Sequence, residues 1–501
     1  MLLAAPILLP LATAVLCFIL RRHWVHRTLS LGSAVVLILI GATILITTLT
    51  AQAPLAAQMG GWAAPFGITL VADTLSGAMV TIAGIALLSA MVYATVEVGP
   101  ETERHGFHAL SHSMTAGVCG AFLTGDLFNL YVWYEVMLIS SFGLLVVGGE
   151  RRQIDGAVKY VALNLVGTLA FLVGVGLLYG TAGTLNMADL AVVLKDRMGE
   201  TAVLGAAGLL LFAFGAKAAL FPVFFWLPAA YHTPAVATSA LFSAMLTKVG
   251  VYSLLRVFTL VFPPGDPVIE GILYGAAGLT IALGALGAAA EDEMRRIFSF
   301  HIVSQIGVMT LGLAIGTPLA LAGAVFYFFH HIPAMMNLFL VGGIISRECG
   351  GAERLGRIGG LYGLAPWLAV LFLVPALSLI GVPPLSGFWA KLFMVRAGVE
   401  AEQYLMAGLI LAASVLTFFY LGRLFVAAFW QPYPGEDEGA LPGALAPGVV
   451  YPPRRLVFSV MALGGVTVVI SLYASVFYDV AAYAAGELSD PISYLRAVLP
   501  G

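Results

Sequence analysis

Long apolar runs, separated by short polar connections, make up almost the whole chain of 501 residues. A run of about 20 apolar residues is long enough to cross a hydrocarbon core of about 30 Å as an α-helix. The pattern therefore predicts an all-α polytopic membrane protein with about 14 transmembrane helices. These helices are expected to begin near Leu2, Leu29, Leu70, His112, Leu127, Ala157, Thr201, Ala235, Val268, Ile297, Leu319, Leu364, Tyr404 and Leu456.

Prolines interrupt the seventh and the twelfth of these runs. Pro222 and Pro228 follow Lys217, and the pair Pro383–Pro384 precedes Lys391. Because proline removes a backbone donor and clashes with the preceding turn, each interruption predicts a broken helix at membrane depth. Broken helices at corresponding positions of two repeats are typical of transporter ion sites. We therefore expect two five-helix repeats, residues 112–262 (helices 4–8) and 263–430 (helices 9–13), between helices 1–3 (1–111) and a loop with helix 14 (431–501).

Composition supports the membrane interpretation and excludes several functions. Hydrophobic residues make up 60% of the chain and charged residues 10%, against about 25% charged residues in soluble domains. The net charge of −3 suggests neither nucleic acid nor an acidic substrate. The three cysteines are isolated, and no complete Walker loop, dinucleotide motif or metal-ligand cluster is present. We expect no cofactor, and we interpret residues 1–20 as an uncleaved first span.

Basic residues predict the orientation of the chain. Arginines cluster in alternate connections, and cytoplasmic loops usually carry this excess. With 14 helices all these connections fall on one side, so both termini are expected outside a cell membrane. The arginines and the one lysine on the basic side are Arg21, Arg22, Arg27, Arg151, Arg152, Lys159, Arg295, Arg296, Arg347, Arg354, Arg357, Arg454 and Arg455.

Four ionisable residues lie inside the apolar runs. Three of the five lysines, Lys217, Lys248 and Lys391, are there, together with Glu135. A charge at bilayer depth is unfavourable by about 2.5 kcal/mol or more, and such residues usually mark an ion or proton path. We expect Glu135 and Lys217 to form an ion pair, because each alone would be an uncompensated buried charge. Lys391 is expected near one end of the path, beside its helix break.

Histidines provide further candidates for the path. His301 shares one helical face with Ser304 and Gln305, and its ordinary pKa lies near neutrality. His330 and His331 are adjacent and point about 100° apart, so only one is expected to face a polar interior. The alternatives are structural: a buried histidine can be a hydrogen-bonded core residue, and the Lys391 break can be a packing device. His232 is no stronger a candidate, and Asp73 and Asp126 are expected to cap helices.

Several segments resemble a known family. Residues 125–141 (GDLFNLYVWYEVMLISS), 213–222 (AFGAKAALFP), 246–252 (LTKVGVY), 298–307 (FSFHIVSQIG) and 383–391 (PPLSGFWAK) are similar to the D subunits of Mrp-type cation/proton antiporters. The wider superfamily includes the antiporter-like subunits of respiratory complex I and of membrane-bound hydrogenases. The resemblance covers at least residues 70–400, and the length fits the D subunit rather than the much longer A subunit.

The resemblance implies a fourteen-helix subunit with inverted repeats, in a multi-subunit complex that exchanges sodium for protons. Glu135, Lys217, Lys248 and Lys391 would form a hydrophilic axis, with His301 and one of His330 or His331 contributing. The implied partners are other membrane subunits, protons, sodium and the lipid bilayer, and the chain would be a secondary transporter rather than an enzyme. Where many relatives place a lysine in helix eleven, this chain has Met335 and Met336.

Two other functions stay open from the sequence. The first is a proton-pumping subunit of a complex I-type or hydrogenase-type complex, in which redox chemistry elsewhere would supply the energy. The second is an assembly scaffold without ion conduction, which the placement of Glu135 and the lysines disfavours.

Overall fold

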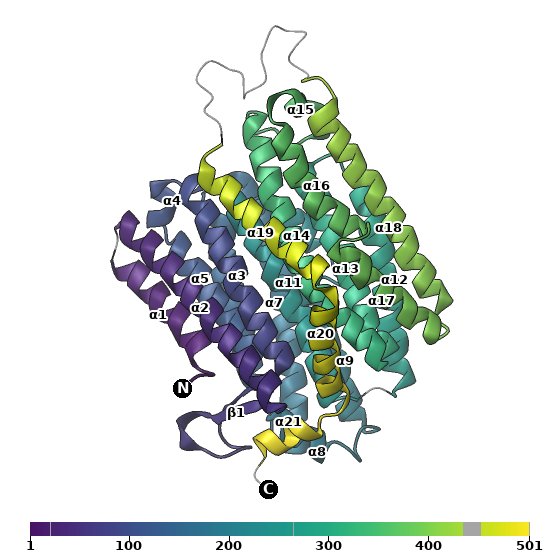
Figure 1. Cartoon of the computed structure of the whole chain (residues 1–501). Helices are drawn as coiled ribbons and strands as arrows, with labels where there is room; N and C mark the ends of the chain where they lie inside the picture. The colour runs from purple at the N-terminus through teal and green to yellow at the C-terminus, as the bar shows by residue number, and fades with distance from the viewer. Residues whose placement is uncertain (21, 264, 434–451, 500–501) are drawn as a thin grey trace.

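A computed structural model describes residues 1–20, 22–263, 265–433 and 452–499. Most of these residues are helical, and the helices lie side by side in an elongated bundle (Figure 1). Among the described helices, eleven are long and apolar enough to cross a membrane. The prediction of a mainly helical polytopic membrane protein is confirmed. Arg21 and most of the polar connection expected after residue 431 lie outside the described residues.

The bundle consists of long helices, with short helices and one hairpin at its ends. The long helices are α1 (Ala5–Ile19), α2 (His23–Ala51), α3 (Thr74–Glu97), α5 (Phe107–Leu123), α6 (Leu127–Val146), α7 (Arg151–Ala182), α9 (Thr201–Ala218), α11 (Val236–Leu260), α12 (Pro267–Ala290), α13 (Met294–Ile315), α14 (Pro318–Glu348), α16 (Pro366–Ile380), α17 (Ser386–Glu400), α18 (Tyr404–Phe425), α19 (Arg454–Leu472) and α20 (Ala474–Ser489). The short helices are α4 (Pro100–Arg104), α8 (Met187–Val193), α10 (Trp226–Ala230), α15 (Leu361–Leu364) and α21 (Ile492–Val498). Strands β1 (Leu55–Gln58) and β2 (Thr69–Ala72) pair antiparallel, with Leu55 opposite Ala72.

Each expected apolar run coincides with a long helix, but some of the expected starts were wrong. The third run does not begin as a helix at Leu70, because residues 69–72 form β2, and α3 starts only at Thr74. Asp73 caps α3 by accepting a hydrogen bond from the Ser76 backbone N–H at 2.9 Å, as expected. α2, α5 and α7 start five or six residues earlier than expected, and each has a histidine or arginine in its first turn.

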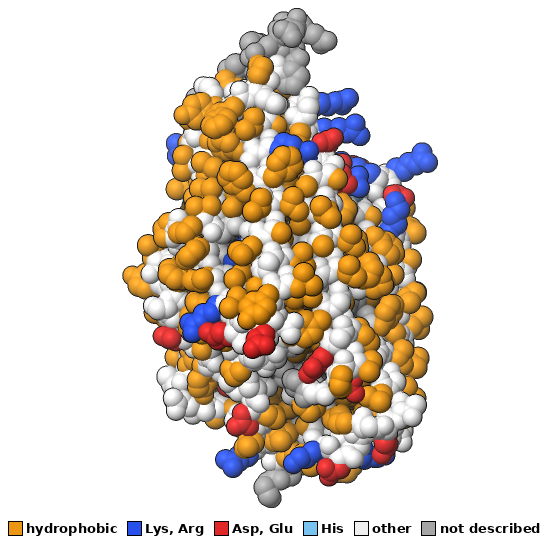
Figure 2. Space-filling view, turned by 90° about the vertical axis from the view of Figure 1, so that its right-hand side faces the viewer, with side chains coloured by type: hydrophobic (Ala, Val, Ile, Leu, Met, Phe, Trp, Pro, Cys, Tyr) orange, Lys and Arg blue, Asp and Glu red, His pale blue; other side chains and the backbone are white. Residues whose placement is uncertain are grey.

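The two ends of the bundle differ. Both chain termini lie at the same end, together with β1, α8 and α21 (Figure 1). The opposite end carries α4, α15 and the start of α19 (Figure 1), and the arginine-bearing connections that flank these elements lie there. Between the ends, the face formed by α12 and α18 is covered mainly by hydrophobic side chains, and charged groups gather in its upper and lower parts (Figure 2). Such an apolar band is what a bilayer requires.

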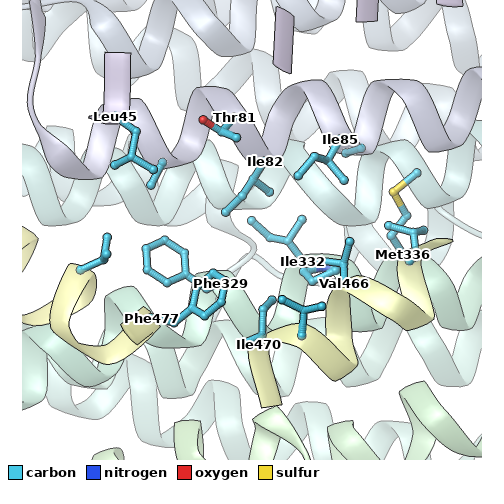
Figure 3. Close-up of a pocket in the computed structure, with 16 residues that line it drawn as sticks. Leu45, Thr81, Ile82, Ile85, Phe329, Ile332, Met336, Val466, Ile470 and Phe477 are labelled. Carbon is cyan, nitrogen blue, oxygen red and sulfur yellow. The ribbon is translucent and has the colours of Figure 1, made fainter. Parts of the chain in front are cut away.

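A cavity of about 370 Å³ lies between the N-terminal helices and the C-terminal pair α19 and α20. Figure 3 shows Ile82 and Ile85 of α3 on one side of it and Val466 and Ile470 of α19 on the other. The hydroxyl of Thr81 at its wall already donates to the Gly77 carbonyl at 2.8 Å. The walls therefore offer a hydrocarbon surface and no free polar group, so this cavity is unsuited to an ion.

Candidate functional site: a row of buried ionisable side chains

The first break in the bundle places Lys217 at a helix end. α9 stops at Ala218, and Ala219 adopts a left-handed conformation (φ 67°). Two bonds satisfy carbonyls that the break leaves free: the Trp226 indole donates to Ala216 at 3.0 Å, and the Leu220 N–H to Gly215 at 2.8 Å. The break predicted from Pro222 is confirmed. Since a helix C-terminus carries partial negative charge, a lysine in the last turn is favoured there.

Lys217 is buried among tyrosines rather than beside a carboxylate. Its Nζ lies 3.4 Å from the Tyr160 hydroxyl and 5.8 Å from the centres of the Tyr134 and Tyr160 rings. The Tyr160 hydroxyl also shares a hydrogen bond with Ser141 Oγ at 2.6 Å. These contacts form a series of polar side chains, Ser141 of α6, Tyr160 of α7 and Lys217 of α9, that can exchange protons.

The expected Glu135–Lys217 ion pair is absent, and that prediction was wrong. Their charged atoms are farther apart than 4.0 Å, and Glu135 Oε1 is buried without a hydrogen-bond partner among the described residues. The physical reason is packing: α7 contacts both α6 and α9, and its Tyr160 occupies the space beside the Lys217 ammonium. Glu135 is half-buried on α6, and its electrostatic attraction to Lys217 acts over more than 4.0 Å.

Lys248 lies in the middle of α11, and its side chain is fully buried. Its Nζ donates to the Ser243 backbone carbonyl at 2.5 Å. A Cβ at Gly250 would lie 2.4 Å from the Ala218 backbone nitrogen, so α11 and the end of α9 touch there. This close approach joins the two helices at Gly250, while Lys248, two residues earlier, lies on the other side of α11 from the contact.

His301 and His331 form the next part of the row. The two rings are stacked, with centroids 6.0 Å apart and planes at 16°. His301 Nδ1 lies 2.5 Å from the Tyr420 hydroxyl of α18. His301 Nε2 and both ring nitrogens of His331 are buried without partners in the described part of the chain. Free ring nitrogens at this depth are suited to accept and release protons, directly or through water.

His330 and Lys391 both lie at the second helix break. α16 ends at Ile380 and α17 begins at Ser386, so the break predicted from Pro383 is confirmed. Lys391 Nζ donates to the backbone carbonyls of Leu379 and Ile380, both at 2.8 Å. His330 Nδ1 lies 2.9 Å from Ser386 Oγ at the start of α17. The lysine therefore donates hydrogen bonds to the free carbonyls at the end of α16. The histidine contacts the start of α17.

The expectation that only one of His330 and His331 faces a polar interior stays a prediction. Both side chains are fully buried, but His330 Nδ1 is hydrogen-bonded, whereas neither ring nitrogen of His331 has a partner among the described residues. Both α13 and α17 contact α14. Side chains that point about 100° apart can therefore meet different partners, with His331 against His301 and His330 against Ser386.

Sequence reasoning missed the tyrosines that connect the row. Tyr160 and Tyr420 each contact one of its ionisable groups, and the Tyr327 hydroxyl donates to Gln305 beside the rings of His330 and His331. All three tyrosines are fully buried. A buried tyrosine hydroxyl usually needs a partner, so a tyrosine in the middle of an apolar run was the available signal.

The remaining candidates from the sequence have structural surroundings. Asp126 caps α6, as expected, through a 2.7 Å bond from the Asn129 backbone N–H. His232 Nδ1 is bonded to the Pro228 carbonyl at 2.9 Å, away from the row. Asp73, besides capping α3, forms a buried ion pair with Arg256 that the sequence did not suggest. No group of three or more histidine, cysteine or acidic side chains within the described residues could hold a metal ion.

Taken in order, Glu135, Lys217, Lys248, His331, His301, His330 and Lys391 form a row from α6 to α17, here called the central row. Except for the half-buried Glu135, its members are at least nine-tenths buried. Groups that each bind one proton, arranged this way, can pass protons sideways through the interior of the bundle.

The chain is similar to several known membrane proteins. Residues 124–417 match the family described as NADH:quinone oxidoreductase/Mrp antiporter, transmembrane. The chain is 38% identical to the D subunit of the Na⁺/H⁺ antiporter of Alkalihalophilus pseudofirmus, over 99% of this chain and 98% of that protein. It is similar to a chain in the Mrp complex of a Dietzia species, with a TM-score of 0.90, 31% identity and 99% of each chain covered. It is also similar to a chain of the archaeal membrane-bound sulfane sulfur reductase, with a TM-score of 0.91, 25% identity and 99% of each chain covered.

The family match extends over more than half of the chain, and the relatives align over nearly all of it. The chain therefore belongs to the family of D subunits of Mrp-type Na⁺/H⁺ antiporters, within the complex I-like superfamily.

Proposed function

We propose that the protein is the proton-translocating D subunit of a multi-subunit sodium/proton antiporter and that protons move along the central row. The observation that carries the proposal is the row itself: buried lysines and histidines at bilayer depth have no structural need to lie in one line. Each is energetically unfavourable alone, and such residues are retained in membranes mainly where ions or protons pass.

Proton transfer along the row follows from repulsion between its cations. Lys217 and Lys248 lie on helices that touch, so two protonated ammonium groups there would repel in a low-dielectric interior. A proton that arrives at Lys217 favours release from Lys248 toward His331. His331 stacks on His301. The Tyr420 hydroxyl is bonded to His301, and the Tyr327 ring contacts the His330 ring. Lys391 then holds the proton at the helix break, where carbonyls accept its hydrogen bonds.

A polar cavity offers access to the row from the arginine-rich end of the bundle. It measures about 440 Å³ and is lined by Glu97, Arg295 and Glu353, among others. Arg295 Nη1 lies 3.4 Å from Ser239 Oγ, and Ser239 is one turn before Ser243, whose carbonyl accepts the Lys248 bond. The succession from Arg295 through Ser239 and Ser243 leads along one face of α11 to Lys248.

The membrane topology belongs to the same proposal. We place α5, α6, α7, α9 with α10, and α11 in one repeat, and α12, α13, α14, α16 with α17, and α18 in the inverted second repeat. The fourth member of each set is the broken one, which supports the pairing. Residue 112 lies inside α5, so the first repeat would begin at Phe107. Fourteen crossings with the arginine-rich connections in the cytoplasm would place both termini outside the cell membrane.

The proposed partners are the other membrane subunits of the antiporter, protons, sodium and lipid. The half-buried Glu135 with its unpaired oxygen lies on α6, whose outer face exposes Phe128 and Ile139. An apolar helix face that carries a carboxylate is suited to a neighbouring membrane subunit.

A second function has a specific observation in its favour. The likeness to a chain of the sulfane sulfur reductase, a respiratory complex, is as close in fold as the likeness to the Mrp chain. The same row could serve a complex whose energy comes from redox chemistry in another subunit.

The experiment that tests the proposal measures proton movement in vesicles that contain the assembled complex. Sodium added on one side should drive protons the other way in the wild type and not in Glu135→Gln or Lys248→Met complexes that still assemble. His232→Gln, outside the row, is the matched control and should behave like the wild type. Proton movement that ignores sodium but follows an electron donor would favour the redox-driven alternative, and normal exchange by Lys248→Met would refute the row.

A further inference from the structure

Six of the nine histidines of the chain lie outside the central row, and five of these fall in residues 23–112: His23, His26, His105, His108 and His112. They belong to α2, to the turn after α4, and to α5, at the arginine-rich end of the bundle. The proposed function uses none of them.

The centre of this group is a buried carboxylate. Glu103 is 1% exposed, and it accepts bonds from His23 Nδ1 at 2.8 Å, from Arg27 Nε at 2.8 Å and from His108 Nε2 at 3.4 Å. Burial by itself raises the pKa of Glu103, but the bonds from His108, Arg27 and His23 outweigh it and hold the pKa at about 2. Glu103 therefore stays ionised at neutral pH and accepts the bonds of the side chains around it.

The histidines form a series that leads from the surface into the bundle. His23 is partly exposed, and it shares Glu103 with the buried His108. His108 Nδ1 is bonded to Ser30 Oγ at 2.8 Å, so both of its ring nitrogens have partners. His112 is one turn deeper on the same face of α5, fully buried, and neither of its ring nitrogens has a partner among the described residues.

Water can reach the outer part of this series. A cavity of about 450 Å³ is lined by Glu103, His108 and His26, with the exposed Arg104 and His105 at its rim. His26 is buried at the cavity wall with both ring nitrogens unpaired in the described part of the chain, and its ring centre lies 5.8 Å from that of His108. Unpaired polar atoms around a space of this size are suited to ordered water.

Serines and a tyrosine connect the inner end of the series with the central row. Ser113, next to His112, accepts a bond from Ser140 of α6 at 3.0 Å. Ser141, next to Ser140, shares a 2.6 Å bond with Tyr160, whose hydroxyl lies 3.4 Å from Lys217 Nζ. The steps from His112 to Ser113 and from Ser140 to Ser141 have no direct bond, and adjacent side chains on a helix point about 100° apart, so each of these steps requires a bridging water.

We propose that His26, Glu103, His108 and His112, here called the histidine cluster, exchange protons between water at the arginine-rich end and Lys217. Because Glu103 stays ionised, the carriers are the histidines, and Ser113, Ser140, Ser141 and Tyr160 conduct between His112 and Lys217. The proposal rests on the proposed function and adds a second access to the central row, apart from the one along α11.

Three elements packed around the histidine cluster place further ionisable side chains beside it. α1 contributes Cys17, α2 contributes His23 and Arg27, and the segment of α4 contributes Arg104 and His105. Arg27 is bonded to Glu103 and keeps its charge at all relevant pH values. Because the pKa of Glu103 is about 2, its carboxylate keeps its charge throughout the range between pH 5 and 8.

The test compares variants of His108 in assembled complexes reconstituted into vesicles. His108→Gln preserves a hydrogen-bonding side chain beside Ser30 but cannot carry a proton, and His108→Ala opens space beside the cavity. Both should slow sodium-dependent proton movement by about tenfold, less than the 10²-fold typical of a sole acid–base group, because the access along α11 remains. Added imidazole should restore the rate of His108→Ala, and methylated imidazoles should do so in proportion to their pKa. His105→Ala, exposed at the cavity rim, is the matched control and should be unchanged.

The possible results separate a proton carrier from a structural group. A wild-type rate and pH profile in His108→Gln would overturn the proposal, since it would show that His108 only holds α2 against α5. Slow exchange in His108→Ala that imidazole does not restore would overturn it as well. A wild-type complex without sodium-dependent proton movement would instead refute the proposed function, whatever the variants do.

Discussion

The contact between α16 and α17 allows a sharp test of the second helix break. Gly387 lies in the first turn of α17, directly against α16. A Cβ at this position would lie 1.8 Å from the Ser378 carbonyl oxygen and 2.8 Å from His330 Cε1. Ordinary van der Waals contact begins at 3.4 Å, so in Gly387→Ala the two helices must separate by the difference between 1.8 Å and 3.4 Å, about 1.6 Å.

A movement of this size has consequences for stability and for transport. Overpacking of a buried contact is destabilising by about 1–3 kcal/mol, and the higher helix propensity of alanine offsets up to about 1 kcal/mol of this. The bond between His330 and Ser386, at 2.9 Å, and the bonds from Lys391, at 2.8 Å, cannot survive such a separation. Since a displacement of about 1 Å at a reacting group can slow a reaction by about 10²-fold, we expect transport to fall at least tenfold.

The assay is thermal unfolding of the purified complex together with sodium-dependent proton movement in vesicles. Gly422→Ala in α18 is the matched control, because no heavy atom lies within 4 Å of the Cβ it would add. That variant should keep its transport and gain up to about 1 kcal/mol of stability. Equal stability and equal transport in both variants would refute the reasoning about the break.

Three further predictions concern separate parts of the molecule. Lys391→Arg should fail to transport although it keeps the positive charge, because arginine hardly releases its proton; normal antiport by this variant would show that only a fixed charge is needed. The folded-state pKa of Glu103 is about 2, below its ordinary value of 4.5, so its stabilising effect is complete above pH 4.5 and is lost as the pH falls toward 2. Melting temperatures should fall over this range in the wild type and stay flatter in Glu103→Gln. Ala86→Leu should extend into the apolar cavity of Figure 3 and stabilise the complex by about 0.5–2 kcal/mol, whereas Ala240→Leu, buried in α11 away from that cavity, should overpack and lower the melting temperature.

Some features of the site were predictable because they depend on local physics. A run of apolar residues forms a helix at bilayer depth wherever it stands in the chain, so the helices and the two breaks could be located from Leu127, Pro222 or Pro383 alone. The cap at Asp126 and the burial of Lys217, Lys248 and Lys391 follow from the same local patterns. No neighbour had to be known for these inferences.

Other features depend on which helices pack together. Tyr160 lies beside the Lys217 ammonium because α7 packs against α9 as well as α6. The ion pair expected from charge alone therefore does not form. Likewise α13 and α17 both contact α14, so that His331 stacks on His301 while His330 bonds to Ser386.

By itself, the sequence determined that the chain forms a helical membrane bundle with two broken helices and ionisable groups at bilayer depth. The tertiary structure alone decided that Tyr160 contacts Lys217, that Tyr420 contacts His301, and that Glu103 gathers histidines from α2 and α5. The physical reason is that helix formation in a bilayer depends on residues within one segment, whereas the partner of a buried polar group is set by contacts between segments far apart in the chain.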